Sequence, residues 1–312
     1  MINIFPSIFI FLLIIFLNKF QSKIIFLPKD DISKVQSTND SNKTLLLNIL
    51  LLFQVILSYF SISFSLSLVM VFIIGLIDDY INLSVFKRFL SVTIILFIFF
   101  IYNQEYLLTE FIINYSFLKL NFYQSLFLSI ILILGFIHVM NMSDGRNGLV
   151  VSYLILIISY LAFKNDFYLD SLYLLILINL ILIFLLNFFN ISYFGNNGIL
   201  VVSVFFGVIL FQLYDEKVLY IREIFILLFI PFYDGIYVTC KRFIKKMSPF
   251  LPDKTHLHHL PSKSNWYLSL LIIISLKILL LYVLNRFEIS FIYLFFITLI
   301  SYSLLRFLIR KL

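Results

Sequence analysis

The stretch SLYLLILINLILIFLLNFF, residues 171–189, contains no charged side chain. Inside lipid only a helix satisfies its own backbone hydrogen bonds, and about 20 apolar residues of helix span the hydrocarbon core. Similar apolar runs recur throughout the 312 residues, of which 62% are apolar and 12% charged. A soluble domain is about 25% charged, a disordered chain is poor in apolar residues, and a membrane barrel alternates apolar and polar residues. The sequence excludes these classes and predicts an all-α polytopic integral membrane protein.

About eleven spans are predicted, and no segment between them is long enough to fold as a soluble domain. Their approximate limits are 2–18, 45–60, 62–77, 89–102, 122–140, 149–163, 168–189, 198–214, 223–240, 266–285 and 288–305. The first run has no basic start and no small-residue cleavage site, which favours an uncleaved helix over a signal peptide. We expect a single transmembrane domain over 1–312, with 10–11 helices and a cytoplasmic basic and histidine-rich loop at about 241–265.

The distribution of Lys and Arg predicts the orientation, because these residues accumulate in cytoplasmic loops. Seventeen of them follow odd-numbered spans, five follow even-numbered spans, and Lys277 lies inside the tenth span. The N-terminus is therefore expected outside and the C-terminus in the cytoplasm, in a multi-pass protein of the cytoplasmic (inner) membrane.

Four polar islands interrupt the apolar chain, and all follow odd-numbered spans, which favours one shared site on the cytoplasmic face. The first is Gly75-Leu-Ile-Asp-Asp-Tyr80, followed by Lys87 and Arg88. Two adjacent carboxylates near lipid need compensating cations or donors. Asp78 and Asp79 therefore belong either to a structural ion network or to a site that handles Mg²⁺ or phosphate.

The second and third islands are rich in glycine and asparagine: Asn141-Met-Ser-Asp-Gly-Arg-Asn-Gly-Leu149 and Tyr193-Phe-Gly-Asn-Asn-Gly198. Asn and Asp oxygens are hard ligands suited to Mg²⁺, and glycine lets backbone N–H groups approach phosphate closely. Asp-Gly and Asn-Gly are also ordinary turn dipeptides. Each island is therefore either a ligand site or a turn without a ligand.

The fourth island, Lys241 to Leu260, holds three of the four histidines of the chain, His256, His258 and His259. Its clustered basic residues are Lys241, Arg242, Lys245 and Lys246. They share one helical face, which predicts a short helix on the membrane surface. Contact with anionic lipid explains the basic residues, whereas the His-Leu-His-His cluster favours binding of a metal or a substrate phosphate.

In this order the islands resemble the polyprenyl-phosphate N-acetylhexosamine-1-phosphate transferases, glycosyltransferase family 4. The matching motifs are Gly-Leu-Ile-Asp-Asp, Asn-Met-Ser-Asp-Gly-x-Asn-Gly-Leu, Gly-Asn-Asn-Gly and Met-Ser-Pro-Phe-x-Pro-Asp-Lys-x-His-Leu-His-His-Leu. The stretch 231–260 is the most specific, and it is more similar to the undecaprenyl-phosphate GlcNAc-1-phosphate transferase branch than to the phospho-MurNAc-pentapeptide transferase branch. The resemblance implies transfer of a sugar 1-phosphate from a UDP-sugar to undecaprenyl (polyprenyl) phosphate with release of UMP. This reaction is the first membrane step of cell-surface glycan synthesis.

The resemblance also implies a role for each island in phosphoryl transfer, which depends on positioning, a divalent cation and cationic side chains. Residues implied in catalysis, by acting on the lipid phosphate or supporting the metal, are Asp78, Asp79, Lys87 and Asp144. Residues implied in binding phosphate, uridine, diphosphate or sugar are Arg88, Gly145, Asn147, His256, His258 and His259. Residues implied in holding Mg²⁺ (or Mn²⁺) are Asn141 and Asn196.

Asn196 departs from the family, which has a Mg²⁺-binding Asp at this position, so one full negative charge is missing. A second hypothesis is therefore a family member impaired in catalysis that acts as a binding or scaffold protein. A third is a transporter, which would place charges at mid-membrane, but only Lys277 and Asp234 lie away from the ends of the predicted spans. The expected partners are a UDP-N-acetylhexosamine, undecaprenyl phosphate and membrane lipid, without nucleic acid. The resemblance also allows a homodimer.

Overall fold

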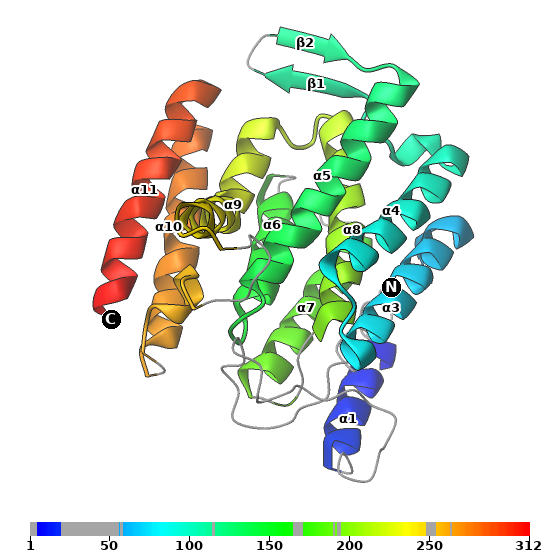
Figure 1. The fold of residues 1–312 in the computed structure, drawn as a ribbon, viewed down its shortest axis with the longest axis horizontal. Helices are drawn as coiled ribbons and strands as arrows, with labels where there is room; N and C mark the ends of the chain where they lie inside the picture. Colours follow the sequence, from blue (N-terminus) through cyan, green and yellow to red (C-terminus); the bar gives the residue numbers. More distant parts are fainter. Residues whose placement is uncertain are drawn as a thin grey trace. The chain divides into compact units, whose positions relative to one another are not determined.

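The computed structural model describes residues 5–19, 56, 59–113, 116–164, 171–189, 191, 195–247, 254–262 and 264–312. This part of the chain is mostly helical and confirms the all-α, multi-pass class (Figure 1). Seven of its helices are long and apolar enough to cross a membrane, and three further apolar helices are shorter. The predicted span 45–60 lies almost wholly outside the described residues.

The chain forms two compact units, and each is made of two separate segments. Unit 1 comprises Met1–Asn103 and Asn147–Phe205, and unit 2 comprises Gln104–Arg146 and Phe206–Leu312. The islands of the sequence are therefore divided. The first and third islands fall in unit 1, the second is split between the units at Arg146, and the histidine island falls in unit 2.

The described part of unit 1 consists of apolar helices. Its helices are α1 (Phe5–Lys19), α3 (Ile62–Ile81), α4 (Val85–Tyr102), α6 (Leu149–Lys164), α7 (Ser171–Phe188) and the first part of α8 (Gly195–Asp215). Within it α3 packs against α4, and α6 packs against α7. The fully buried side chains include Phe64 and Leu68 on α3 and Leu96 and Phe100 on α4.

The connection between α3 and α4 shows how local chemistry places the first island. Asn82 ends α3 in the left-handed conformation (φ 49°), which asparagine tolerates better than most residues. Ser84 then caps α4, because its hydroxyl accepts the Lys87 backbone N–H at 3.4 Å. The chain therefore reverses within three residues and returns Arg88 to the end of α3.

Unit 2 is organised around one long helix. Its elements are η2 (Gln104–Tyr106), β1 (Glu110–Ile113), β2 (Ser116–Lys119), α5 (Phe122–Ser143), the last part of α8, α9 (Ile221–Ile244), η3 (Leu257–His259), α10 (Trp266–Arg286) and α11 (Phe291–Lys311). Helices α5, α10 and α11 each pack against α9. Helix α9 is therefore the element through which the rest of unit 2 is held together.

A small antiparallel hairpin, β1 with β2, was not predicted from the sequence and occupies the connection before α5 (Figure 1). Glu110 pairs with Lys119 in its register. The backbone N–H and hydroxyl of Thr109 both donate to Asp215 Oδ2 at 2.9 Å, and the Ile112 N–H donates to the Tyr214 hydroxyl at 2.6 Å. These contacts fix the hairpin to the end of α8.

The basic stretch after the ninth predicted span folds differently from the prediction. Helix α9 continues to Ile244, so Lys241 and Arg242 form its last turn instead of a separate surface helix. Arg242 is buried, whereas Lys245 and Lys246 are exposed. The prediction of a separate amphipathic helix on the membrane surface was wrong. Arg242, one of its four basic residues, is buried in contact with His256.

Candidate functional site

The two carboxylates of the first island have different partners within unit 1. Asp78 is only 2% exposed, and Arg88 Nη1 donates to its Oδ2 at 2.8 Å. Lys87, by contrast, is exposed on the first turn of α4. Of the two cations predicted to compensate the acidic pair, Arg88 forms the ion pair. A buried charge needs such a partner, since removing it would leave an uncompensated charge.

Asp79 binds the beginning of α8. Its Oδ1 accepts the backbone N–H of Asn196 at 3.0 Å, and its Oδ2 accepts that of Asn197 at 3.2 Å. The first N–H groups of a helix have no partners inside the helix and carry its positive dipole end. Asp79 therefore stabilises the α8 terminus, and it places a carboxylate beside the third island.

Gly75 makes this close approach possible. A Cβ atom on Gly75 would lie 2.2 Å from Asn197 Cα, a distance that no side chain can occupy. The glycine of the first island therefore serves contact between α3 and the start of α8. It brings the predicted residues Asp79 and Asn196 together.

The side-chain amide of Asn197 is fully buried, and neither its Oδ1 nor its Nδ2 has a hydrogen-bond partner. Leaving such a group unsatisfied costs about 1–3 kcal/mol, so it marks a place where a polar ligand would be stabilised. The side chains of Asp79, Asn196 and Asn197 carry hard oxygen donors of the kind that Mg²⁺ prefers. In the described part of the chain, no three His, Cys, Asp or Glu side chains are arranged so that they could hold a metal ion. A cation beside Asp79 would therefore depend on amide oxygens as well as on the carboxylate.

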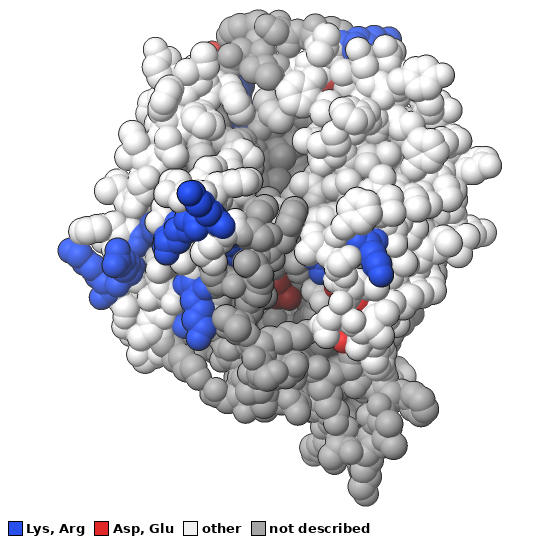
Figure 2. Space-filling model, in the orientation of Figure 1, with Lys and Arg blue, Asp and Glu red and all other residues white. Residues whose placement is uncertain are grey.

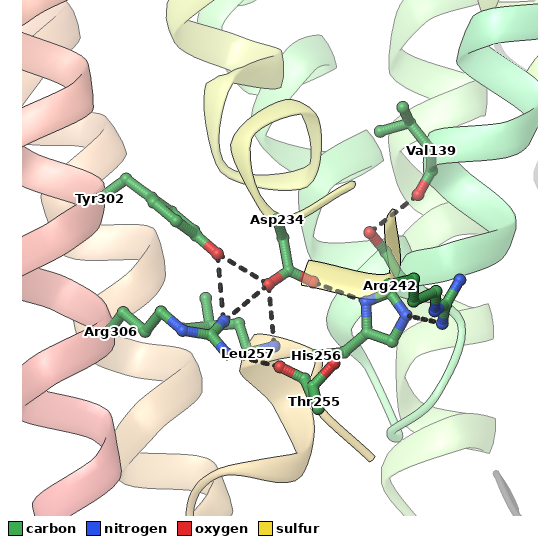
Figure 3. Close-up of polar contacts among 9 residues, drawn as sticks. Val139, Asp234, Arg242, Thr255, His256, Leu257, Tyr302 and Arg306 are labelled. Carbon is green, nitrogen blue, oxygen red and sulfur yellow. Dashed lines mark hydrogen bonds and ion pairs between the residues drawn. The ribbon is translucent and has the colours of Figure 1, made fainter. Parts of the chain in front are cut away.

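Unit 2 contains the described residues 254–262, which include the histidines of the fourth island and which we call the histidine loop. A buried carboxylate of α9, that of Asp234, holds this loop. Asp234 Oδ2 lies 2.8 Å from His256 Nδ1, and Asp234 Oδ1 accepts the backbone N–H of Leu257 at 2.9 Å (Figure 3). From α11, the Tyr302 hydroxyl donates to Oδ1 at 2.8 Å, and Arg306 Nη1 donates at 3.1 Å. Asp234 therefore ties the loop to two helices.

Two arginines complete this network (Figure 3). Arg306 also donates to the Thr255 carbonyl, just before the histidines. Buried Arg242 lies with its Nη2 3.4 Å from His256 Nε2. Because the Asp234 carboxylate accepts, the Nδ1 proton of His256 points to it, and Nε2 is left to accept from Arg242. The network thus fixes both the position and the tautomer of His256.

The three imidazoles lie in contact with one another. The rings of His256 and His258 are stacked with centroids 5.4 Å apart, and those of His258 and His259 are 4.2 Å apart. Burial, followed by the charges of His259, His256 and Arg146, holds the pKa of His258 well below its usual value. Burial is also the largest cause that lowers the pKa of His259 to about 4. Both rings are therefore neutral at pH 7 and can donate or accept hydrogen bonds.

The second island and the histidine loop interlock within unit 2. A Cβ atom on Gly145 would lie 1.8 Å from His258 Nε2, so the ring packs directly on the glycine backbone. Arg146 donates to the carbonyls of Pro261 at 3.0 Å and Ser262 at 3.2 Å, and its guanidinium lies 5.2 Å from the Trp266 ring centroid. Two segments far apart in sequence, both predicted as substrate-binding, therefore form one cluster.

The other predicted residues occupy the edges of these clusters. Asn141 is half-buried in the last turn of α5, and its carbonyl accepts the N–H of Asp144, the exposed residue that ends the helix. Asn147 is half-buried before α6 in unit 1. Asn141 and Asp144 are three residues apart, so both lie on the same side of the helix end.

Basic side chains accompany the histidine loop. On the face shown in Figure 2, Lys and Arg gather over the part of unit 2 that contains the ends of α9 and α11. The exposed basic residues of these segments and of the histidine loop are Lys245, Lys246, Lys254, Arg310 and Lys311. Such a patch attracts phosphate groups, whether of lipid or of nucleotide.

Sequence reasoning missed Asp234, Tyr302 and Arg306 as parts of the site. Asp234 was noted only as a charge inside a span. An ionisable residue within a span is costly and points by itself to a functional network. That signal was present, whereas the partners Tyr302 and Arg306 lie about 70 residues away and carry no local motif.

Residues 61–214 match the family model for glycosyl transferase family 4. A comparison with curated proteins found no match. The matched segment contains the first three islands and ends before Asp234 and the histidine loop. This similarity supports a polyprenyl-phosphate sugar-phosphate transferase activity in general, on a multi-pass membrane protein that uses a sugar nucleotide and a membrane lipid.

Proposed function

We propose that the chain transfers an N-acetylhexosamine 1-phosphate from a UDP-sugar to undecaprenyl (polyprenyl) phosphate and releases UMP, at the cytoplasmic face of the cytoplasmic membrane. A phosphate oxygen of the lipid attacks the β-phosphorus of the UDP-sugar, the bond to the bridging oxygen breaks, and UMP leaves with that oxygen. The observation that carries the proposal is the packing of His258 on the Gly145 backbone. It joins two motifs of the proposed family in one cluster.

In unit 2 the cluster suits a nucleotide diphosphate. His258 and His259 are neutral at pH 7, because burial lowers the pKa of each ring, and they offer hydrogen bonds without needing counter-ions. Arg146 and the exposed Lys254 add positive charge nearby. Phosphoryl transfer is catalysed mainly by positioning and by electrostatic stabilisation of the phosphoryl oxygens. We assign Gly145 to the nucleotide and the histidines to the diphosphate and sugar.

In unit 1 the acidic pair suits the lipid phosphate. Arg88 forms an ion pair with the buried Asp78, and exposed Lys87 lies one residue earlier on α4. We assign Lys87 to the attraction of phosphate and Asp78 and Asp79 to its orientation or deprotonation. Asn147, also in unit 1, is assigned to the uridine by resemblance.

Mg²⁺ fits the oxygen donors of the chain, and when bound it would neutralise negative charge on the diphosphate. In unit 1, Asn196 would offer an amide oxygen beside Asp79, and the unsatisfied Oδ1 of Asn197 is a further donor. In unit 2, Asn141 would offer an oxygen, supported by Asp144 at the same helix end. These assignments are part of the proposal.

The test is a membrane-fraction assay with polyprenyl phosphate and a panel of labelled UDP-N-acetylhexosamines, with Mg²⁺, with Mn²⁺ and with a chelator. We expect a lipid-linked product with at least one sugar and loss of product with chelator. UDP-sugar binding without any product, despite good expression, would instead favour the impaired family member that Asn196 suggests. The same panel identifies the sugar.

A further inference from the structure

Helix α9 contains a proline in its interior. Pro231 has no backbone N–H, so the carbonyl of Leu227, four residues earlier, loses its donor within the helix. Proline also bends a helix, because its ring clashes with that same carbonyl. In Figure 1 the first part of α9 is seen from the side and its last part nearly end-on.

A lysine of α10 donates to this carbonyl. Lys277 is 0% exposed, and its Nζ lies 2.6 Å from the Leu227 oxygen. A lysine buried among membrane-spanning helices is expensive unless its ammonium is hydrogen-bonded. The catalytic scheme above gives Lys277 no role, so its position at the carbonyl that Pro231 deprives of a helical donor requires an explanation.

The bend lies just before the residues that hold the histidine loop. Asp234 follows Pro231 by three residues, and Arg242 lies in the last turn of the same helix. Both contact His256. The direction of α9 after Pro231 therefore decides where these two side chains meet the loop.

We propose that Lys277 is a positioning residue, which replaces the backbone donor missing at Pro231 and fixes the bend of α9 that directs Asp234 and Arg242 to His256. Its consequence for catalysis rests on the proposed function, whereas its consequence for the shape of α9 does not. The proposal predicts that Lys277 contributes to stability only while residue 231 is proline.

The experiment is a double-mutant cycle of Lys277→Met and Pro231→Ala in the full-length protein in detergent. Lys277→Met keeps the bulk of the side chain and removes the donor, and Pro231→Ala returns an N–H to the helix. We expect Lys277→Met to lower the melting temperature clearly in the parent and hardly at all in the Pro231→Ala background, because coupled residues are not additive. Equal losses in both backgrounds would overturn the proposal. If Lys277→Met does not fold, recovery of folded protein by Pro231→Ala supports it, and failure to recover overturns it.

The chain offers a second readout of position. Cys240 is its single cysteine and is exposed on α9 after the bend, and Leu279 is exposed on α10. Spin labels at Cys240 and at Leu279→Cys report the distance between the two helices. We expect Lys277→Met to shift or broaden this distance, and Lys277→Arg, which retains a donor, to keep it closer to that of the parent. An unchanged distance in Lys277→Met would contradict the proposal.

The kinetic readout separates this inference from the proposed function. We expect Lys277→Met to reduce kcat by about 10- to 100-fold, because small misplacements of active-site groups have effects of this size. Partial rescue of kcat by Lys277→Arg supports positioning. If no variant and no parent protein forms product, the proposed function fails while the stability cycle and the label distance still decide the role of Lys277.

Discussion

At the residue scale, Gly75 and Gly145 are needed for space, and the contact at each can be tested by adding one methyl group. In Gly145→Ala the new Cβ would overlap the His258 ring, so this ring must shift. We expect a large loss of transferase activity, about 10²-fold, with KM for the UDP-sugar raised. The measurement is steady-state kinetics in membranes with matched expression.

Gly135→Ala is the matched control, because nothing lies within 4 Å of a Cβ atom at that position on α5. Alanine is also the better helix former, so the control should be neutral or slightly stabilising. If Gly145→Ala and Gly135→Ala had the same transferase activity, the contact between the second island and the histidine loop would not be needed for activity.

The acidic pair allows a second prediction at this scale. We expect Asp78→Asn to reduce turnover by about 10²-fold or more, because electrostatic groups that act in the transition state have effects of this size. Asp79→Asn should reduce turnover and also lower stability by about 0.5–2 kcal/mol, since Asp79 caps α8. Kinetics and thermal unfolding of each variant give the two values.

Glu288→Gln serves as the control for the acidic pair, because Glu288 is exposed between α10 and α11. It should change neither rate nor stability. An equal effect of all three substitutions would mean that the carboxylates act only through the general stability of the protein.

Local motifs allowed part of the site to be predicted residue by residue. The resemblance assigned Gly145 and His258 to substrate binding, and in the structure the two residues are in contact. Asp234 was missed as a site residue because its partners come from η3 and α11, which no sequence spacing connects. The part that Asp79 plays at α8 was also missed, because a helix cap supplied from a distant helix leaves no local pattern.

At the scale of elements, we expect the stability that the histidine loop contributes to the fold to depend on pH. The folded-state pKa of His259 is lowered from 6.5 to about 4, and burial holds that of His258 well below its usual value. An unfolded chain therefore binds protons more readily than the folded loop. The stabilising contribution of neutral histidines is complete above pH 6.5 and is lost as the pH falls from about 6.5 toward 4.

The measurement is the melting temperature of the parent protein and of His259→Gln between pH 7.5 and 5, with Gln as a side chain that does not titrate. We expect the parent to lose more stability than the variant over this range. Parallel curves for the two proteins would show that His259 is not held neutral by the fold.

The elements themselves were predicted well where they are long and apolar and poorly where tertiary contacts decide them. Predicted span 223–240 corresponds to α9, but the helix extends to Ile244. Its last turn includes Arg242, which is buried in contact with His256. The β1–β2 hairpin was not predicted because its position depends on Thr109 and Ile112 binding to the end of α8. The bend at Pro231 could have been expected from the sequence, but its partner Lys277 could not.

At the scale of the whole molecule, the distribution of charge predicts the topology. A reporter fused after Leu312 or within 254–262 should report the cytoplasm, and one placed in the β1–β2 hairpin should report the outside. The reason is the excess of Lys and Arg after odd-numbered spans. An external signal from the histidine loop would contradict the cytoplasmic site and remove its access to a nucleotide sugar.

The most direct test of the central claim follows the β-phosphate itself. Membranes that contain the protein are given undecaprenyl phosphate and UDP-GlcNAc, or the preferred UDP-sugar from the panel, labelled at the β-phosphorus. Transfer of a sugar 1-phosphate moves the label into the lipid and releases unlabelled UMP, and Asp78→Asn should reduce both. Transfer of sugar to the lipid with the label left in UDP, or no transfer with any UDP-N-acetylhexosamine, would contradict the account.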